Sequence, residues 1–259
     1  MGRAGPLSRD CADTYAGIAG LLFHLYYVRT EGLQATPAAL SLLSAEESAR
    51  YRRFIPPEKR LEYLVTRVLV RTVLSAALGT PPGDLRFSCN EWGRPEVDPP
   101  TELSFNISHT PGLVVCAVRQ GHTLGVDTEL FSRAPALLEL APQVFSRQEQ
   151  ADLFALPREE RAHRAVVLWT LKESYIKARG RGLAIALDLF SFHFSPGHIG
   201  IEVAPGLDDQ GDRWEFRLVV LGPHLVAVAA DCGNSVAMSV NVTELHLSAF
   251  GAGEPPFPD

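Results

Sequence analysis

The chain has 259 residues, of which 46% are apolar and 21% are charged, and its formal net charge is −6. This is enough for one large or two small domains with a core; no apolar run approaches the roughly 20 residues of a membrane span, and the negative charge argues against nonspecific nucleic-acid binding. Four widely spaced cysteines without a CxxC pair, and a start that lacks the apolar core of a signal peptide, predict a cytoplasmic protein with free thiols and no zinc site.

The first half of the chain predicts a strand, then helices, then three strands. The aromatic-rich alternation of residues 21–28 is typical of a strand. Short helices are expected near Pro37 and Ser44, and a long, largely apolar helix over residues 58–78. Three strand candidates follow, at residues 85–93, 102–109 and 113–121.

The same order returns in the second half. A strand is expected at residues 123–129, then helices at 134–140, 146–156 and 161–179, then strands at 189–194, 199–203, 214–220 and 225–232. The repetition predicts an α+β fold of two pseudo-symmetric halves, strand–helix–three strands each, packed around a central cleft. We expect the halves to span residues 15–122 and 123–250, with 1–14 and 251–259 as loose tails.

A carboxylate and an ammonium group lie on one side of the helix predicted to end at Gly180. Glu173 and Lys177 are four residues apart, so they fall close together on the helix surface. A solvated ion pair is one interpretation. Because Trp169 and Ile176 flank the pair on the same side, we favour a second covered surface, as in a cleft.

Two carboxylates share one face of the strand at 123–129. Asp127 and Glu129 project together because alternate side chains of a strand point the same way. Two carboxylates suit a hard cation such as Mg²⁺ that keeps positions open for substrate oxygens. Two solvated acids at a strand end are the alternative. Glu173 completes a carboxylate trio only if its helix crosses this strand.

Polar side chains end the strand at 102–109. Asn106 and Ser108 share a face and His109 follows, so this corner is able to bind an anion such as phosphate. Turn hydrogen bonds explain the same residues equally well. A Ser/His hydrolase is disfavoured, because adjacent Ser108 and His109 cannot easily form a nucleophile–base pair and there is no GxSxG turn. Guanidinium groups for further phosphate contacts stand at Arg50, Arg53 and Arg94.

Together these blocks resemble the 4′-phosphopantetheinyl transferases of the Sfp type. The matching residues are RRF (52–54), FSCNEWGRP (87–95), FNISHT (105–110), GVDTE (125–129) and WTLKESYIKARGRGL (169–183). The similarity runs from about residue 42 to residue 194, and the last two blocks together are the specific ones.

The resemblance implies two α+β halves in one chain, with coenzyme A in the cleft between them. Because both halves lie in one chain, we expect a monomer. Mg²⁺, or Mn²⁺ in its place, would be held by Asp127, Glu129 and Glu173. The phosphates of coenzyme A would contact Ser108, His109 and Lys177, with Asn106 in the same corner. The nucleotide site would be lined by Arg94 and Pro95, and Arg50 would reach the 3′-phosphate. Some family members carry a lysine where this chain has Glu47, so we expect Arg53 to share that contact.

The implied reaction moves the phosphopantetheine arm of coenzyme A onto a serine of an apo acyl, aryl or peptidyl carrier protein and releases 3′,5′-ADP. Glu173 is the best candidate for taking the serine proton, as base, metal ligand or both, and Lys177 for stabilising charge on the leaving oxygen. Two other classes remain open: a metal-dependent phosphohydrolase and a non-enzymatic coenzyme A or nucleotide binder. The carrier and its pathway are left undetermined.

Overall fold

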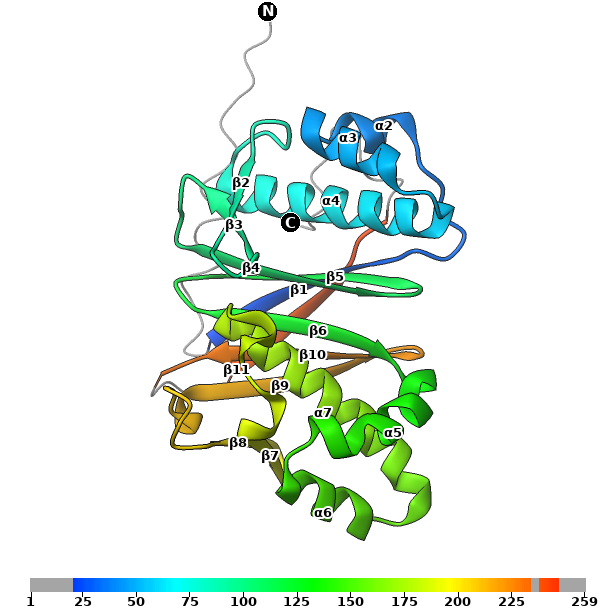
Figure 1. The fold of residues 1–259 in the computed structure, drawn as a ribbon. Coiled ribbons are helices and arrows are strands. Elements are labelled where there is room, and N and C mark those ends of the chain that lie inside the picture. The colour runs from blue at the N-terminus through cyan, green and yellow to red at the C-terminus, as the bar shows by residue number, and fades with distance from the viewer. Residues whose placement is uncertain (1–20, 234–237, 247–259) are drawn as a thin grey trace, which may run out of the picture.

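Two β-sheets lie face to face in the middle of the molecule, and a long helix covers the outer face of each (Figure 1). The computed structural model describes residues 21–233 and 238–246. The expected tails at 1–14 and 251–259 lie outside these residues.

The first sheet has the strand order β11-β1-β5-β4, and helix α4 covers it (Figure 1). Strands β1, β5 and β4 are antiparallel neighbours, whereas β11 pairs with β1 in parallel. A small hairpin, β2–β3, follows α4 in the chain. The elements are β1 Leu21–Arg29, α2 Pro37–Ser41, α3 Ala45–Arg53, α4 Pro57–Leu78, β2 Arg86–Cys89, β3 Pro95–Asp98, β4 Leu103–Thr110, β5 Leu113–Gln120 and β11 Met238–Glu244.

The second sheet has the order β6-β10-β9, all antiparallel, and helix α7 covers it. The helices are α5 Ala134–Val144, α6 Arg147–Ala155 and α7 Arg158–Arg179, with short 3₁₀ turns at Phe131–Arg133, Gly182–Ala184, Leu187–Leu189 and Gly211–Arg213. The strands are β6 Leu124–Leu130, β7 Phe190–Ser195, β8 His198–Val203, β9 Trp214–Leu221 and β10 His224–Asp231. Strands β7 and β8 form a separate hairpin.

The alternation of apolar residues along the central strands explains this layering. On β1, Phe23 and Leu25 face the other sheet, while Tyr26 and Val28 face α4. A sheet that is covered on both faces needs apolar side chains on both, and residues 113–118 of β5 are all apolar and buried. The two sheets therefore alternate with three apolar layers, one between the sheets and one between each sheet and the helix that covers it.

The predicted α+β class is confirmed, and the expected strands and helices recur with small shifts of their ends. Two strands were not expected. The segment after Gly93 turns back as β3, and β11 follows the last predicted strand and joins the sheet of β1. The division of the chain near residue 122 stays a prediction.

A search for membrane spans among the helices at 21–233 and 238–246 finds no segment with the length and apolar character to cross a bilayer.

Candidate active site

Strand β6 and helix α7 approach each other closely at Gly125. A Cβ atom at this position would collide with the carbonyl oxygen of Ser174 and the backbone of Ala178. Only glycine permits this contact without a shift of the helix. The close approach places Lys177 beside Asp127, with 2.6 Å between Nζ and Oδ1. The helix thus crosses the strand, as the carboxylate trio requires.

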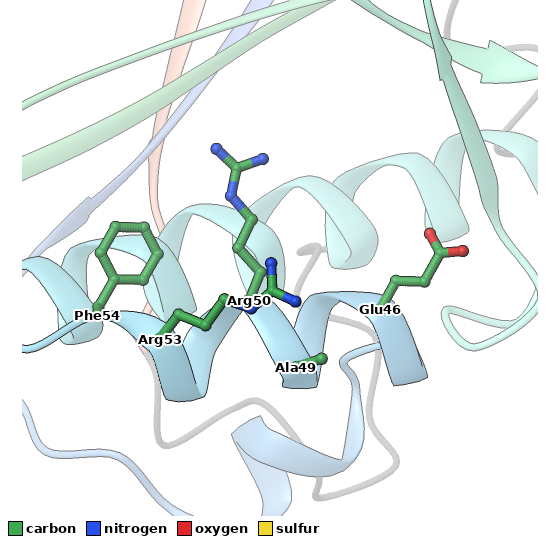
Figure 2. Close-up of a pocket in the computed structure, with 5 residues that line it drawn as sticks. All are labelled: Glu46, Ala49, Arg50, Arg53 and Phe54. Carbon is green, nitrogen blue, oxygen red and sulfur yellow. The ribbon is translucent and has the colours of Figure 1, made fainter.

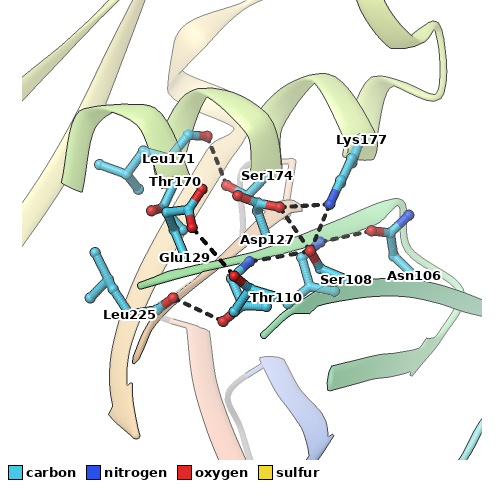
Figure 3. A network of polar contacts seen from close by, with 12 residues as sticks. Asn106, Ser108, Thr110, Asp127, Glu129, Thr170, Leu171, Ser174, Lys177 and Leu225 are labelled. Atoms are coloured by element: carbon cyan, nitrogen blue, oxygen red, sulfur yellow. Dashed lines mark hydrogen bonds and ion pairs between the residues drawn. The ribbon is translucent and has the colours of Figure 1, made fainter. Parts of the chain in front are cut away.

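Three side chains of β4 reach across to β6, which belongs to the other sheet (Figure 3). The bonds are Val126 N–H to Asn106 Oδ1 at 3.0 Å, Thr128 N–H to Ser108 Oγ at 3.3 Å, and Thr110 Oγ1 to Glu129 Oε1 at 3.4 Å. All three β4 side chains are buried. These bonds satisfy buried polar groups and hold the two sheets together at the site.

Ser108, Asp127 and Lys177 form one polar cluster from three different elements. Ser108 Oγ donates to Asp127 Oδ1 at 2.8 Å, and Lys177 Nζ donates to Ser108 Oγ at 2.9 Å (Figure 3). The ion pair of Lys177 is therefore with Asp127, instead of the simple helix pair with Glu173. The Lys177 side chain is 29% exposed, so the cluster lies at the surface of the protein and not in its interior.

Glu173 experiences the charges of the other two expected metal ligands. Burial, followed by the negative charge of Asp127, raises the pKa of Glu173 to about 7; Lys177 opposes the rise and Glu129 adds to it. Glu129 itself pairs with Arg133, at 2.8 Å between Oε2 and Nη1. Among residues 21–233 and 238–246, no three His, Cys, Asp or Glu side chains are arranged as a ready metal site.

His109 pairs with a residue that the motif analysis missed. Its Nδ1 lies 3.2 Å from Oε1 of Glu62, on helix α4. Burial lowers the pKa of His109, and Glu62 opposes that shift. Lys59 bonds the same carboxylate at 3.0 Å. The signal in the sequence is weak, because Glu62 and Lys59 resemble any ion pair on a helix surface.

Arg50 and Arg53 meet at a separate hollow of about 680 Å³ on helix α3 (Figure 2). The remaining lining residues are Glu46, Ala49 and Phe54. The Arg50 guanidinium also lies 5.6 Å from the centre of the Tyr63 ring. This hollow shares no residue with the cluster around Asp127, so it is a second basic position.

Arg94 ends the turn that joins β2 to β3, Pro95 is the first residue after it, and both are partly buried. The Arg94 guanidinium is hydrogen-bonded to backbone carbonyl groups, including those of Lys177 and Ala178. Pro95 begins β3, opposite Cys89.

Comparisons with known proteins show which family the chain resembles. A family model described as the 4'-phosphopantetheinyl transferase superfamily matches residues 123–229, and one described as 4'-phosphopantetheinyl transferase, N-terminal, matches residues 33–121. The 4'-phosphopantetheinyl transferase Sfp of Bacillus subtilis is 34% identical over 183 residues, which are 70% of this chain and 80% of that protein. The 4'-phosphopantetheinyl transferase HetI of Nostoc is 35% identical over 145 residues, 55% and 61% of the two chains.

The solved structure of holo-acyl-carrier-protein synthase from Thermotoga maritima aligns with a TM-score of 0.36 and 22% identity, covering 42% of this chain and 62% of that one. This likeness is too weak to argue from. The family models and the curated relatives suffice: the chain belongs to the 4'-phosphopantetheinyl transferase superfamily.

Proposed function

We propose that this phosphopantetheinyl transferase moves the phosphopantetheine arm of coenzyme A to a serine of an apo carrier protein and releases 3′,5′-ADP, with Mg²⁺ held by Asp127, Glu129 and Glu173. The observation that supports this most is the meeting of Ser108, Asp127 and Lys177 from β4, β6 and α7. These are a hydroxyl, a carboxylate and an ammonium group, as a site for a metal-bound diphosphate requires.

The chemistry of the carboxylates fits a hard divalent cation. Oxygen ligands suit Mg²⁺ and equally Mn²⁺. The raised pKa of Glu173 reflects burial first and then the negative charge of Asp127, and a cation would offset both by favouring the ionised carboxylate. Ser108 and Lys177 both bond Oδ1 of Asp127, and Arg133, which pairs with Glu129, is 46% exposed and therefore has room to turn away. When bound, Mg²⁺ supplies positive charge to the diphosphate oxygens.

Donor groups of the chain would bind and orient the phosphates. The Lys177 ammonium and the Ser108 hydroxyl are already within 2.9 Å of each other, so both reach one phosphate. His109 follows Ser108 on β4, and its Nδ1 lies 3.2 Å from Oε1 of Glu62, so its other ring nitrogen would contact a phosphate. Lys177 then stabilises the negative charge that develops on the leaving oxygen.

Glu173 is the proposed general base. The serine oxygen forms a bond to the phosphorus that carries pantetheine, the bond to the bridging oxygen breaks, and 3′,5′-ADP leaves with that oxygen. Glu173 accepts the serine proton, directly or through water. Without a bound cation the pKa of Glu173 is raised to about 7, so burial favours its taking up a proton.

The basic hollow on α3 is the proposed position of the 3′-phosphate. Arg50 and Arg53 line it together, and a guanidinium group binds phosphate through two parallel hydrogen bonds. Glu46 also lines the hollow and carries the opposite charge, so binding of the 3′-phosphate depends on both arginines.

Intact-mass measurement of the acceptor tests the proposal. The protein is mixed with coenzyme A, Mg²⁺ and several apo carrier domains. A mass gain of one phosphopantetheine arm is expected. Released 3′,5′-ADP without that gain would instead support a phosphohydrolase, and neither product would support a coenzyme A binder.

A monomeric state, a cytoplasmic location and the absence of nucleic-acid partners remain predictions from the sequence. Sedimentation of the purified chain tests the first of these.

A further inference from the structure

The β2–β3 hairpin docks onto the C-terminal end of helix α7. Asn90 Nδ2 donates to the carbonyl of Gly180 at 3.1 Å. Arg94 Nη1 donates to the carbonyls of Lys177 at 3.3 Å and Ala178 at 2.9 Å. The last carbonyl groups of a helix have no partner within it, and they carry its partial negative charge. The hairpin therefore supplies both hydrogen bonds and positive charge where α7 needs them.

The same guanidinium also contacts the two strands of the site. Arg94 Nη2 donates to the carbonyl of Leu124 at 3.2 Å and lies 3.5 Å from that of Phe105. Phe105 lies on β4 shortly before Ser108, and Leu124 lies on β6 shortly before Asp127. One planar group thus touches the backbone of the three elements that supply Ser108, Asp127 and Lys177.

Arginine and glycine are both needed for this contact. A guanidinium spreads five donors over three nitrogen atoms in a rigid fork, so Nη1 of Arg94 bonds Ala178 while Nη2 bonds Leu124. The donors of lysine all sit on one nitrogen atom, which cannot occupy both positions. Gly180 has a φ of 65°, and a Cβ there would lie 3.3 Å from Arg94 Cδ and 3.4 Å from Asn90 Nδ2. Asn90 Oδ1 accepts from the N–H groups of Trp92 and Arg94, both at 2.9 Å, which fixes the turn that carries the arginine.

We propose that Arg94 is a positioning residue: by bonding the backbones of β4, β6 and α7, it sets the position of Lys177 relative to Ser108 and Asp127, and its side chain does not touch coenzyme A. This inference rests on the proposed function, since Lys177 and Asp127 are assigned to the reaction there. It differs from the nucleotide-lining role that the family resemblance implies for Arg94.

Steady-state kinetics of Arg94→Lys separate the two roles. A misplaced Lys177 should lower kcat about tenfold or more, whether or not the KM for coenzyme A also rises, because Lys177 both binds a phosphate and stabilises the leaving oxygen. Arg86→Lys is the matched control, because Arg86 is exposed on the same hairpin and bonds only Gly83 among the described contacts. A raised KM with an unchanged kcat would overturn the proposal and place Arg94 on the nucleotide.

A double-mutant cycle with Lys177→Met tests how Arg94 acts. If Arg94 works through Lys177, then Arg94→Lys should reduce kcat much less in the Lys177→Met background than in the wild type. Equal fold losses in both backgrounds would show that Arg94 acts independently and would overturn the proposal.

Hydrogen exchange provides a readout that does not depend on activity. Arg94→Lys should speed amide exchange in the last turn of α7, while the last turn of α4 stays unchanged. Unchanged exchange at α7 would contradict the inference even if the enzyme is active. If the wild type transfers nothing to any carrier, the proposed function fails. The exchange result still decides whether Arg94 holds the end of α7 in place. Should circular dichroism show that Arg94→Lys is unfolded, Asn90→Ala is measured in the same ways, with the same expected results.

Discussion

Helices α4 and α7 are two versions of one scaffold, and only one of them carries the reaction chemistry. Both have 22 residues, follow a proline and end at a left-handed glycine, Gly79 or Gly180, with φ of 65°. Each is preceded by a nine-residue helix with a capping box. The capping glutamates of α3 and α6 also reach the long helix that follows and pair with a buried cation there. This shared frame fixes where each long helix lies on its sheet.

The buried ion pairs differ between the halves. Glu47 pairs with both Arg67 and Arg71, whereas Glu149 pairs with Lys172 at 2.8 Å. Arg71 and Lys172 occupy the same position when the long helices are aligned on their closing glycines. Lys172 also donates to two backbone carbonyls, so its ammonium is satisfied. These pairs secure the frame and lie outside the reaction.

The functional difference lies elsewhere on the two helices. In the same alignment, Glu173 and Lys177 of α7 correspond to Thr72 and Ala76 of α4. The glycine contact at Gly125 then brings α7 close enough to β6 for Lys177 to reach Asp127. A capped short helix followed by a long helix therefore does not make a site by itself. The charged side chains of α7 and its contact with β6 at Gly125 have to occur together.

The largest expected effect comes from removing the chemistry of α7. Glu173→Gln should bind coenzyme A but lose about 10²–10⁴-fold in transfer rate, because it cannot accept the serine proton. Thr72→Ala, the matching position of α4, should retain the wild-type rate. Single-turnover transfer and coenzyme A titration measure the two quantities. A near-wild-type rate for Glu173→Gln would remove it from the mechanism.

Breaking the buried pairs should affect the halves unequally. Lys172→Met leaves the Glu149 carboxylate buried without its ammonium partner and should cost about 3–5 kcal/mol of unfolding free energy. Arg71→Met should cost less, because Glu47 keeps Arg67. Urea unfolding of both variants checks the order. An equal or larger loss for Arg71→Met would contradict the comparison.

Adding a side chain at Gly125, where β6 contacts α7, should have a smaller effect on stability. Gly125→Ala forces a methyl group against the backbone of α7 and should cost about 1–3 kcal/mol. The transfer rate should also fall, because Lys177 moves away from Asp127. Gly83→Ala is the control, since a Cβ there meets nothing within 4 Å. Thermal unfolding and transfer assays are measured on both variants. Wild-type values for Gly125→Ala would show that α7 accommodates the added methyl group.

The smallest expected effect is a pH dependence from the first half. Burial opposes the charge of Glu47, but the Arg71 hydrogen bond and the charge of Arg67 outweigh it, so the pKa of Glu47 lies below its ordinary value of 4.5. A lowered folded-state pKa stabilises the protein above about pH 4.5, and this contribution is lost as the pH falls through the folded-state value.

Glu47→Gln should therefore be less stable than the wild type near neutral pH, with a flatter decline in acid. Urea midpoints measured across that acid range test it; parallel curves for the two proteins would show that Glu47 does not titrate there.

Much of the candidate site was readable from local patterns. The helix stop at Gly180, the face shared by Asp127 and Glu129, and the polar end of β4 all depend on neighbours within a few residues. Glu62 as the partner of His109 was not readable, because an ordinary helix ion pair gives the same pattern. Strand β11 was missed although Met238, Val240 and Val242 alternate with polar residues. The strand is largely exposed, and no local pattern indicates that it returns to pair with β1.

The sequence by itself determined the order of helices and strands, the family, and the residue types of the site, since periodicity, capping and motifs are short-range properties. The tertiary structure alone decided that β4, β6 and α7 meet, that β11 pairs with β1, and that Arg94 bonds the backbones of the site. Those contacts join residues far apart in the chain, and they depend on how two covered sheets pack, which no local pattern specifies.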